Sequence, residues 1–261
     1  MKELALLKVG GAELEEGPQL DQLVGALSRL AAERELIVVH GGGSEIAALQ
    51  KRMGLQPRFV EGLRVTDEES LRVAEMVLSG AVNKRLTARL VRQGVKALGL
   101  SGVDGGLLCA KVLKHPQGDL GRVGEITEVH AEVILDLLSK GFTPVVSPIS
   151  LGMDGRPLNV NADHAALAIA GALKVAEAIF LTDVPGVLRE GAILPALSAE
   201  EAEQLIASGQ ISGGMIPKVR SALQAIERGV GAVRITNLAG LAAGSGTRIL
   251  GRISTTETPK H

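Results

Sequence analysis

The sequence is nearly devoid of aromatic side chains: only three of its 261 residues are Phe, and there is no Trp or Tyr. Hydrophobic residues still make up 46% of the chain, so the core must be aliphatic, built from Leu, Val, Ile and Ala. Base stacking on aromatic rings, the usual way to hold single-stranded nucleic acid, is therefore essentially excluded. A formal net charge of −1 also provides no broad basic face for a polyanion. We expect no nucleic-acid partner.

Cysteine is almost absent as well. Cys109 is the single one, which excludes an intramolecular disulfide and a multi-cysteine metal cluster, and we expect it to be a small core residue. No apolar run approaches the ~20 residues of a membrane span, and the N-terminus lacks the pattern of a secretory signal. These absences favour a soluble cytoplasmic enzyme without a membrane partner. The length suffices for one large α/β unit or two intertwined lobes.

Short apolar runs, typical of strands buried on both faces, alternate along the chain with amphipathic helical patterns. Such strand–helix–strand units form parallel sheets with right-handed crossovers. The expected strands are 4–7, 36–39, 95–100, 143–149, 178–181 and 232–235, with 247–250 as an edge strand and hairpins at 58–66 and 107–124. The expected helices are 18–33, 44–54, 129–140, 162–173 and 198–208, and a further helix ends near 228. Residues 67–94 are expected to form either two helices or one bent helix.

Glycines follow the first two expected strands at the point where each strand ends. Lys8-Val-Gly-Gly ends the first, and His40-Gly-Gly-Gly ends the second, just before a helix that Ser44 is expected to cap. Glycine lets backbone N–H groups approach a ligand closely, and a helix N-terminus favours anions. The carboxyl ends of parallel strands open onto one crevice. The pattern predicts an anion site, most simply for phosphate, although strand-Gly-Gly alone is also an ordinary turn.

A second polar stretch, Asn159-Val-Asn-Ala-Asp163, opens the expected helix 162–173. Asn and Asp are common helix caps, so one of these side chains has a structural explanation. Three polar side chains within five residues exceed what one cap requires. We therefore expect part of this stretch to serve a functional site.

Six motifs, taken together and in this order, resemble the amino acid kinase family, in its acetylglutamate-phosphorylating branch. They are Lys8-Val-Gly-Gly, Val-His-Gly-Gly-Gly (39–43), Gly-Leu-Arg-Val-Thr (62–66), Asn-Val-Asn-Ala-Asp (159–163), Thr-Asp-Val-Pro-Gly (182–186) and Gly-Gly-Met-Ile-Pro-Lys (213–218). The resemblance extends from the first strand to residues 247–250. It implies an α/β fold, a three-layer sandwich of helices around a mainly parallel, open sheet of about eight strands.

The resemblance also implies an activity and a division of the chain. The activity is transfer of the ATP γ-phosphoryl group to the side-chain carboxylate of N-acetyl-L-glutamate, the second step of arginine biosynthesis. Residues 1–172 would form a lobe that binds the acetylated amino acid and dimerises. Residues 173–261 would form the ATP-binding lobe, within one continuous sheet. Mg²⁺ would be carried by the nucleotide, and we expect no direct metal ligands.

Individual roles follow from the same resemblance. Lys8 and Lys218 match the lysines that hold the transferring phosphoryl oxygens, and Asp163 matches the carboxylate that orients both lysines. The substrate would be held by Gly42, Gly43, Arg64 and Asn159, with Arg64 binding the α-carboxylate as a bidentate fork. The nucleotide would lie against Gly10, Gly11, Thr182, Asp183, Gly186, Ser212, Gly214 and Met215.

This chemistry needs no general base, because a carboxylate is already a nucleophile. Catalysis then consists of positioning two anions and neutralising their charge. We accordingly expect His40 to be a core or positioning residue and His164 to lie at the surface or the lobe boundary. Arg58 and Lys84 are expected to be solvated or interface residues.

The same motifs favour this activity over several alternatives. A kinase acting on aminoadipate or glutamate attached to a carrier protein would show a basic substrate mouth and no intact Gly-Leu-Arg-Val-Thr segment. Glutamate 5-kinase normally carries a further domain. A silent nucleotide sensor would lack one of the two lysines or the aspartate. A nicotinamide-binding protein would show Gly-x-Gly-x-x-Gly. The early position of Lys8 leaves no room for the N-terminal helix of arginine-inhibited relatives, so we expect an arginine-insensitive homodimer.

Overall fold

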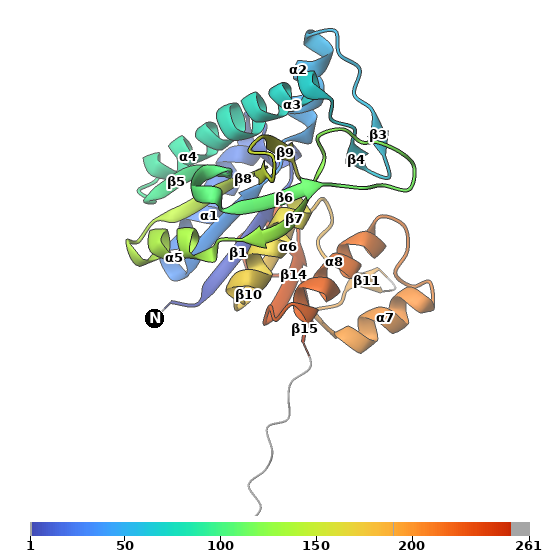
Figure 1. Ribbon diagram of the computed structural model, residues 1–261. Helices are drawn as coiled ribbons and strands as arrows, with labels where there is room; N and C mark the ends of the chain where they lie inside the picture. The colour runs from blue at the N-terminus through green and yellow to red at the C-terminus, as the bar shows by residue number, and fades with distance from the viewer. Residues whose placement is uncertain (1, 190, 252–261) are drawn as a thin grey trace, which may run out of the picture.

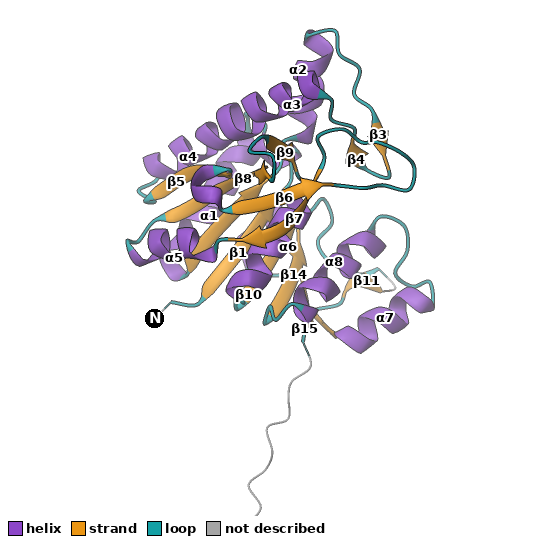
Figure 2. Ribbon diagram, in the orientation of Figure 1, coloured by secondary structure: helices purple, strands orange, loops and turns teal. Residues whose placement is uncertain are grey.

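The computed structural model describes residues 2–189 and 191–251 and shows a large sheet between two layers of helices (Figures 1 and 2). The strands are β1 (Leu4–Val9), β2 (Glu35–His40), β3 (Phe59–Val60), β4 (Leu63–Arg64), β5 (Ala97–Gly102), β6 (Leu108–Val112), β7 (Gly124–Val129), β8 (Thr143–Gly152), β9 (Pro157–Asn159), β10 (Glu177–Leu181), β11 (Leu188–Arg189), β12 (Ala192–Ile193), β13 (Ala196–Ser198), β14 (Ala232–Thr236) and β15 (Thr247–Leu250). The α-helices are α1 (Pro18–Glu33), α2 (Gly43–Arg52), α3 (Glu68–Glu75), α4 (Asn83–Arg92), α5 (Ala131–Ser139), α6 (Ala162–Leu173), α7 (Ala199–Ala207), α8 (Met215–Glu227) and α9 (Leu238–Ala243).

The main sheet has eleven strands in the described part of the chain. Its order is β13-β15-β14-β10-β1-β2-β8-β6-β7, with β5 and β9 also paired to β8. Most pairings are parallel; β14–β15, β6–β7 and β8–β9 are antiparallel. The expected α/β class with a mainly parallel sheet is confirmed. The short hairpin strands extend the sheet beyond the eight or so that the family resemblance implies.

Strand β1 lies in the middle of this sheet, between β2 from the first part of the chain and β10 from the last part. Leu7 lies opposite Val38 of β2 on one side and Ile179 of β10 on the other. All three are fully buried, as their continuous apolar runs predict. Because β10 belongs to the last third of the chain, the two expected lobes share one sheet.

Successive strand residues enter two different cores, because side chains alternate across a sheet. Leu6 of β1 packs into the core beneath α5, α6, α7 and α8, whereas Leu7 packs into the core beneath α1, α2, α3, α4 and α9. Both cores are aliphatic apart from Phe180, as the composition predicts. The result is the expected three-layer sandwich.

The helical run from 68 to 92 is continuous but not uniform. A π-helical segment, η2 (Met76–Val82), separates α3 from α4, which begins at Asn83. The buried Asn83 side chain donates hydrogen bonds to the carbonyls of Leu100 (3.3 Å) and Val145 (2.8 Å). These bonds hold the run against β5 and β8. π-Helical turns frequently occur near functional sites.

Some local predictions are confirmed and others are wrong. The spacing of Ser198 and Glu201 predicts a capping box, and α7 begins with one. Helix α2 begins at Gly43 with Gly42 as its N-cap, so Ser44 is not the cap. Strand β15 is not at the edge, because it pairs with both β14 and β13. No helix in the described ranges is long and apolar enough to span a membrane.

Candidate active site

An ion pair between Lys8 and Asp163 lies at the carboxyl end of the central strand. Lys8 is near the end of β1, and Asp163 is in the first turn of α6, which packs on β1. Lys8 Nζ and Asp163 Oδ1 are 2.9 Å apart. The Lys8 side chain is only 15% exposed, which strengthens the interaction relative to a solvated pair. The pair therefore places a fixed, partly neutralised positive charge at the sheet's ligand-binding edge.

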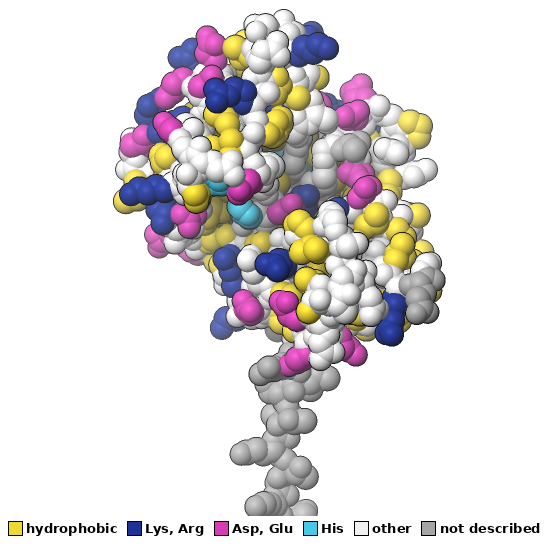
Figure 3. Space-filling view, turned by 90° about the vertical axis from the view of Figure 1, so that its right-hand side faces the viewer, with side chains coloured by type: hydrophobic (Ala, Val, Ile, Leu, Met, Phe, Trp, Pro, Cys, Tyr) yellow, Lys and Arg dark blue, Asp and Glu magenta, His cyan; other side chains and the backbone are white. Residues whose placement is uncertain are grey.

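Two cavities meet at this ion pair, and both of them are lined by Lys8 and Asp163. The larger, of about 210 Å³, lies among the glycine loops, Arg64 and Asn159. The smaller, of about 90 Å³, is lined by Thr182, Pro217, Lys218 and Ser221 among others. Viewed from the side, the surface is hollowed between the part that carries α2 and the part that carries α7 and α8 (Figure 3). Acidic and basic side chains lie close together in that hollow.

The two glycine loops lie against each other at the wall of the larger cavity. A Cβ atom on Gly11 would be 3.3 Å from the backbone nitrogen of Gly43, and the Gly41 N–H donates to the Val9 carbonyl at 3.0 Å. Gly42 has a φ of +159°, and a Cβ there would come within 2.8 Å of Leu78 in η2. Glycine is required because backbones and the π-helical segment approach so closely.

The N-terminus of α2 opens from these loops. Among the described residues, no side chain forms a hydrogen bond that caps it. Its first backbone N–H groups, together with the positive end of the helix dipole, are directed to the loop region. An anion in the larger cavity can therefore be bound by both glycine loops and by Lys8.

Arg64 supplies a second cation to this cavity and is held rigidly. It is buried; Nη1 donates to Gln50 Oε1 at 2.6 Å, and Nη2 donates to the Gly43 carbonyl at 2.8 Å. Its guanidinium also lies 4.6 Å from the ring centroid of Phe59. Burial lowers the pKa of Arg64 from its ordinary value, yet an arginine remains charged at neutral pH. The remaining N–H groups are suited to a carboxylate.

Each polar side chain of the 159–163 stretch has a separate structural role. Asn161 caps α6 by accepting a hydrogen bond from the Asp163 N–H at 2.8 Å. Asn159 Nδ2 donates to the Thr66 hydroxyl at 3.1 Å, and that hydroxyl donates to the Arg64 carbonyl at 2.7 Å. The cap explains Asn161, and all three polar residues of the stretch line the larger cavity.

His40 is a buried positioning residue rather than an acid or base. Its Nδ1–H donates to the Gly41 carbonyl (2.9 Å), because a carbonyl can only accept; Nε2 accepts from Asn83 Nδ2 at 3.0 Å. Burial, together with the positive charges of Arg85 and Lys84, lowers the pKa of His40 to about 4. The imidazole is therefore neutral at physiological pH, and it orders the second glycine loop.

The second lysine lies on the opposite side of the ion pair. Lys218, in the first turns of α8, lies 3.6 Å from Asp183 Oδ1. The pKa of Asp183 is held below its usual range by three groups. They are the Thr182 hydroxyl, which donates a hydrogen bond at 2.9 Å, the backbone N–H of Asp183 itself, and the charge of Lys218. Lys218 lines the smaller cavity together with Lys8, but its ionic partner is Asp183 rather than Asp163.

The other residues expected near the nucleotide come from two loops. Ser212 and Gly214 are exposed in the turn that leads into α8, and Met215 begins that helix. Gly186 packs against Thr247, where a Cβ would approach Oγ1 to 2.7 Å. The Thr247 hydroxyl in turn donates to the Leu194 carbonyl. The requirement for glycine at 186 therefore already has a packing reason.

Three residues that hold Arg64 were not predicted from the sequence: Gln50, Phe59 and Thr66. Gln50 is buried on α2, and its Nε2 donates to the Ser70 hydroxyl at 2.8 Å. The sequence signal for Gln50 was its place as a polar residue on the apolar face of an amphipathic helix. Because buried polar groups are hydrogen-bonded, such a residue is expected to have a polar partner. The expected surface positions of Arg58 and His164 are confirmed, because both are exposed.

Comparison with known proteins identifies the family. A sequence model described as "Amino acid kinase family" matches residues 3–237. Acetylglutamate kinase from Roseiflexus sp. (strain RS-1) is 54% identical over 246 residues, which cover 94% of this chain and 92% of that protein. Acetylglutamate kinase from Chloroflexus aurantiacus (strain ATCC 29366 / DSM 635 / J-10-fl) is 50% identical over 249 residues, with 95% and 97% coverage.

Among solved structures, N-acetylglutamate synthase from Neisseria gonorrhoeae, complexed with coenzyme A and N-acetyl-glutamate, has a TM-score of 0.84 at 26% identity. The likeness covers 99% of this chain and 62% of that one. The family model, the relatives and the shared fold agree with the resemblance that the motifs carry. The chain belongs to the amino acid kinase family.

Proposed function

We propose that the protein is an acetylglutamate kinase, which phosphorylates the side-chain carboxylate of N-acetyl-L-glutamate with ATP. The observation that carries the proposal is the 54% identity to an acetylglutamate kinase over 94% of the chain. The larger cavity supports it, because it joins a buried, hydrogen-bonded Arg64 to the Lys8 ammonium and the glycine loops. A substrate with two carboxylates requires cationic or N–H groups at both ends, and this cavity has them.

The reaction is a direct phosphoryl transfer. A carboxylate oxygen of the substrate forms a bond to the γ-phosphorus, the bond from that phosphorus to the β,γ-bridging oxygen breaks, and ADP leaves with the electron pair. Lys8 and Lys218 neutralise the charge on the transferring group from the two sides of the crevice. The glycine-loop N–H groups align the attacking carboxylate. No proton has to move for the bond to form.

Magnesium, when bound with the nucleotide, supplies further neutralisation of the phosphate charge. Asp163 and Asp183 are each already paired with a lysine. These two carboxylates therefore serve mainly to orient Lys8 and Lys218, and the ion would rely on phosphate oxygens and water. This arrangement is consistent with Mg²⁺ that enters on ATP.

We further propose that the two parts of the chain divide the substrates. Residues 1–172 contribute Arg64 and Asn159 to the larger cavity, which would hold the acetylated amino acid. The part from 173 onward contributes Thr182 and Lys218 to the smaller one, which would open to ATP. Asp183, Gly186, Ser212, Gly214 and Met215 would contact the nucleotide around that opening.

A cytoplasmic homodimer that arginine does not inhibit completes the proposal. Apolar side chains exposed on the 1–172 part, such as Val91 on α4 and Leu98 on strand β5, support dimerisation there. Sedimentation velocity would then give the mass of a dimer. A monomer or a hexamer, or strong inhibition by millimolar arginine, would contradict this part of the proposal.

The activity is tested by trapping the acyl phosphate with hydroxylamine in the presence of MgATP. We expect hydroxamate from N-acetyl-L-glutamate and little from glutamate or aspartate. Signal with glutamate but none with its acetylated form would overturn the substrate assignment. The Arg58→Lys variant is the matched control for variants of Arg64, since Arg58 is exposed on the same hairpin.

A further inference from the structure

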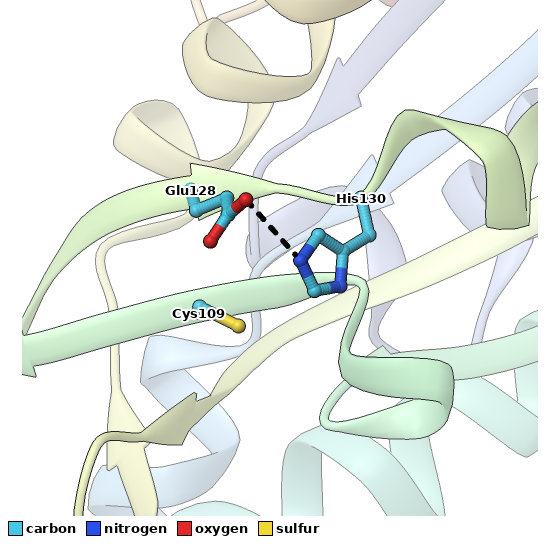
Figure 4. A group of neighbouring side chains, drawn as sticks. All are labelled: Cys109, Glu128 and His130. Carbon is cyan, nitrogen blue, oxygen red and sulfur yellow. Dashed lines mark ion pairs between the residues drawn. The ribbon is translucent and has the colours of Figure 1, made fainter.

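Three potential metal ligands lie together outside the two cavities of the active site. Cys109 is on β6, Glu128 is on β7, and His130 directly follows β7 and precedes α5 (Figure 4). A ligand atom of each lies within 4.8 Å of one from each of the others. Cys109 was expected to be a core residue; it is in fact partly exposed. A single cysteine excludes a multi-cysteine cluster, but not a site of mixed ligands.

The strand register produces this cluster. Cys109 lies directly opposite Glu128 in the antiparallel β6–β7 pair, and the register shifts between Cys109 and Ala110. Directly opposed residues on one face of such a pair are neighbours, and a bulge changes the direction in which a side chain points. His130 directly follows β7 as the N-cap of α5, and its Nε2 lies 3.4 Å from Glu128 Oε1. The strand register therefore places Cys109 beside Glu128, and the end of β7 places His130 next to Glu128.

The separations suit a tetrahedral zinc ion. His130 Nε2 and Glu128 Oε1 are 3.4 Å apart. Bonds of about 2.0–2.2 Å at tetrahedral angles put N and O ligands roughly 3.4 Å apart, and an S and an N ligand roughly 3.6 Å apart. The nitrogen–oxygen separation therefore already suits zinc, and the sulfur, within 4.8 Å of the other ligand atoms, needs to approach by about 1.2 Å at most. Figure 4 shows Nε2 directed to the Glu128 carboxylate, with the Cys109 sulfur on the same side of the ring.

Neighbouring backbone restrains two of the three ligands. The His130 N–H donates to the Leu107 carbonyl at 3.0 Å, which fixes the start of α5 relative to β6. Gly106 has a φ of +66°, and a Cβ there would lie 3.3 Å from His130 Nδ1, so the loop packs closely on the ring. The Cys109 thiol donates to the Gly106 carbonyl at 3.6 Å. Both the imidazole and the sulfur are therefore partly oriented before an ion arrives.

We propose that Cys109, Glu128 and His130 form a zinc-binding site with water as the fourth ligand. Thiolate, imidazole and carboxylate are the three side-chain ligand types that Zn²⁺ uses, and a soft sulfur disfavours Mg²⁺ and Ca²⁺. The side chains of His130 and Glu128 are 36% and 66% exposed, so an ion can reach them from solvent. Binding converts the thiol to a thiolate and releases its proton, so zinc uptake strengthens as pH rises. The ion ties strands β6 and β7 to the start of α5.

Cobalt provides the direct test, because a Co²⁺–thiolate bond gives a charge-transfer band in the near ultraviolet. The full chain is prepared without a histidine tag, treated with a chelator, and titrated with Co²⁺ in the absence of nucleotide. We expect the band to saturate at one ion per chain and to disappear when Zn²⁺ is added. A chromogenic chelator in competition then measures the zinc affinity.

Variants separate this site from adventitious binding. Cys109→Ser should abolish the band, and His130→Gln should weaken zinc binding by about 10-fold or more, the loss that even outer-shell changes cause. His115→Gln is the matched control, since His115 also pairs with a carboxylate, Glu61, at 3.2 Å; it should leave both readouts unchanged. No band in the wild-type chain, or a zinc affinity unaltered in Cys109→Ser, would overturn the proposal. Thermal melting of each zinc-free variant verifies that it is folded.

Discussion

Replacing Arg64 by lysine tests how the larger cavity holds its ligand. Lysine retains the charge but lacks the planar fork that donates at once to Gln50 (2.6 Å) and to the Gly43 carbonyl (2.8 Å). A hydrogen bond to a charged group contributes about 1.5–3 kcal/mol. With about 1.4 kcal/mol per factor of ten, loss of the bidentate contact with the substrate should raise the KM for acetylglutamate roughly 10- to 100-fold.

The change in kcat should be smaller, because Arg64 would bind the end of the substrate that does not react. Removing binding that is equal in the ground state and the transition state raises KM and leaves kcat largely unchanged. The KM for ATP should not change. Initial rates from the hydroxamate assay, with each substrate varied in turn, separate these constants.

Stability provides an independent readout of the same change. The buried Gln50 Oε1 loses its donor, and a buried acceptor left unsatisfied costs about 1–3 kcal/mol. We expect the free energy of unfolding of Arg64→Lys to fall by about that amount, whereas Arg58→Lys should match the wild type in both assays. An unchanged KM for acetylglutamate, or a loss confined to kcat, would refute the assignment of Arg64 to substrate binding.

Three further variants test the rest of the site. Lys8→Ala should lower kcat by about 10²–10³-fold in the hydroxamate assay, because Lys8 neutralises the transferring group and is oriented by Asp163 at 2.9 Å; near wild-type turnover would exclude that role. Gly42→Ala should lower the free energy of unfolding in urea by about 1–3 kcal/mol, since its Cβ would lie 2.8 Å from Leu78; an unchanged midpoint would show that the loop is not tightly packed. His40 has a folded pKa of about 4, below its ordinary 6.5. The unfolded chain therefore gains a proton first, and the wild type should lose up to about 3 kcal/mol of stability as pH falls from 6.5 to 4. His40→Gln should flatten that slope, and an equal slope in both proteins would contradict the buried neutral imidazole.

Local patterns predicted the elements well, because they depend on contacts within a few residues. The apolar run at Leu4 to Leu7 and the helical spacing of 18–33 correspond to β1 and α1. The Ser198–Glu201 capping box could also be predicted from the sequence, since both partners lie within one helical turn. The π-helical segment within 68–92 was not, because its sequence has ordinary helical periodicity.

For the active site, too, the sequence predicted some features and the tertiary structure decided others. The resemblance of the six motifs to the amino acid kinase family is what identified Lys8, Asp163 and Lys218 together as candidate catalytic residues. Which of them pair was not determined by the sequence: Asp163 contacts Lys8, and Lys218 contacts Asp183. Ion pairing depends on separations of a few ångströms, and these are set by how α6 and α8 pack on the sheet.

The sequence by itself determined the fold class, the aliphatic core and the glycine loops, because period, composition and backbone freedom are properties of short stretches. Only the tertiary structure decided that Gln50 holds Arg64 and that β15 lies inside the sheet. It alone also brought Cys109 beside Glu128 and His130. These contacts join residues far apart along the chain, and their formation depends on strand register and packing, which no local pattern specifies.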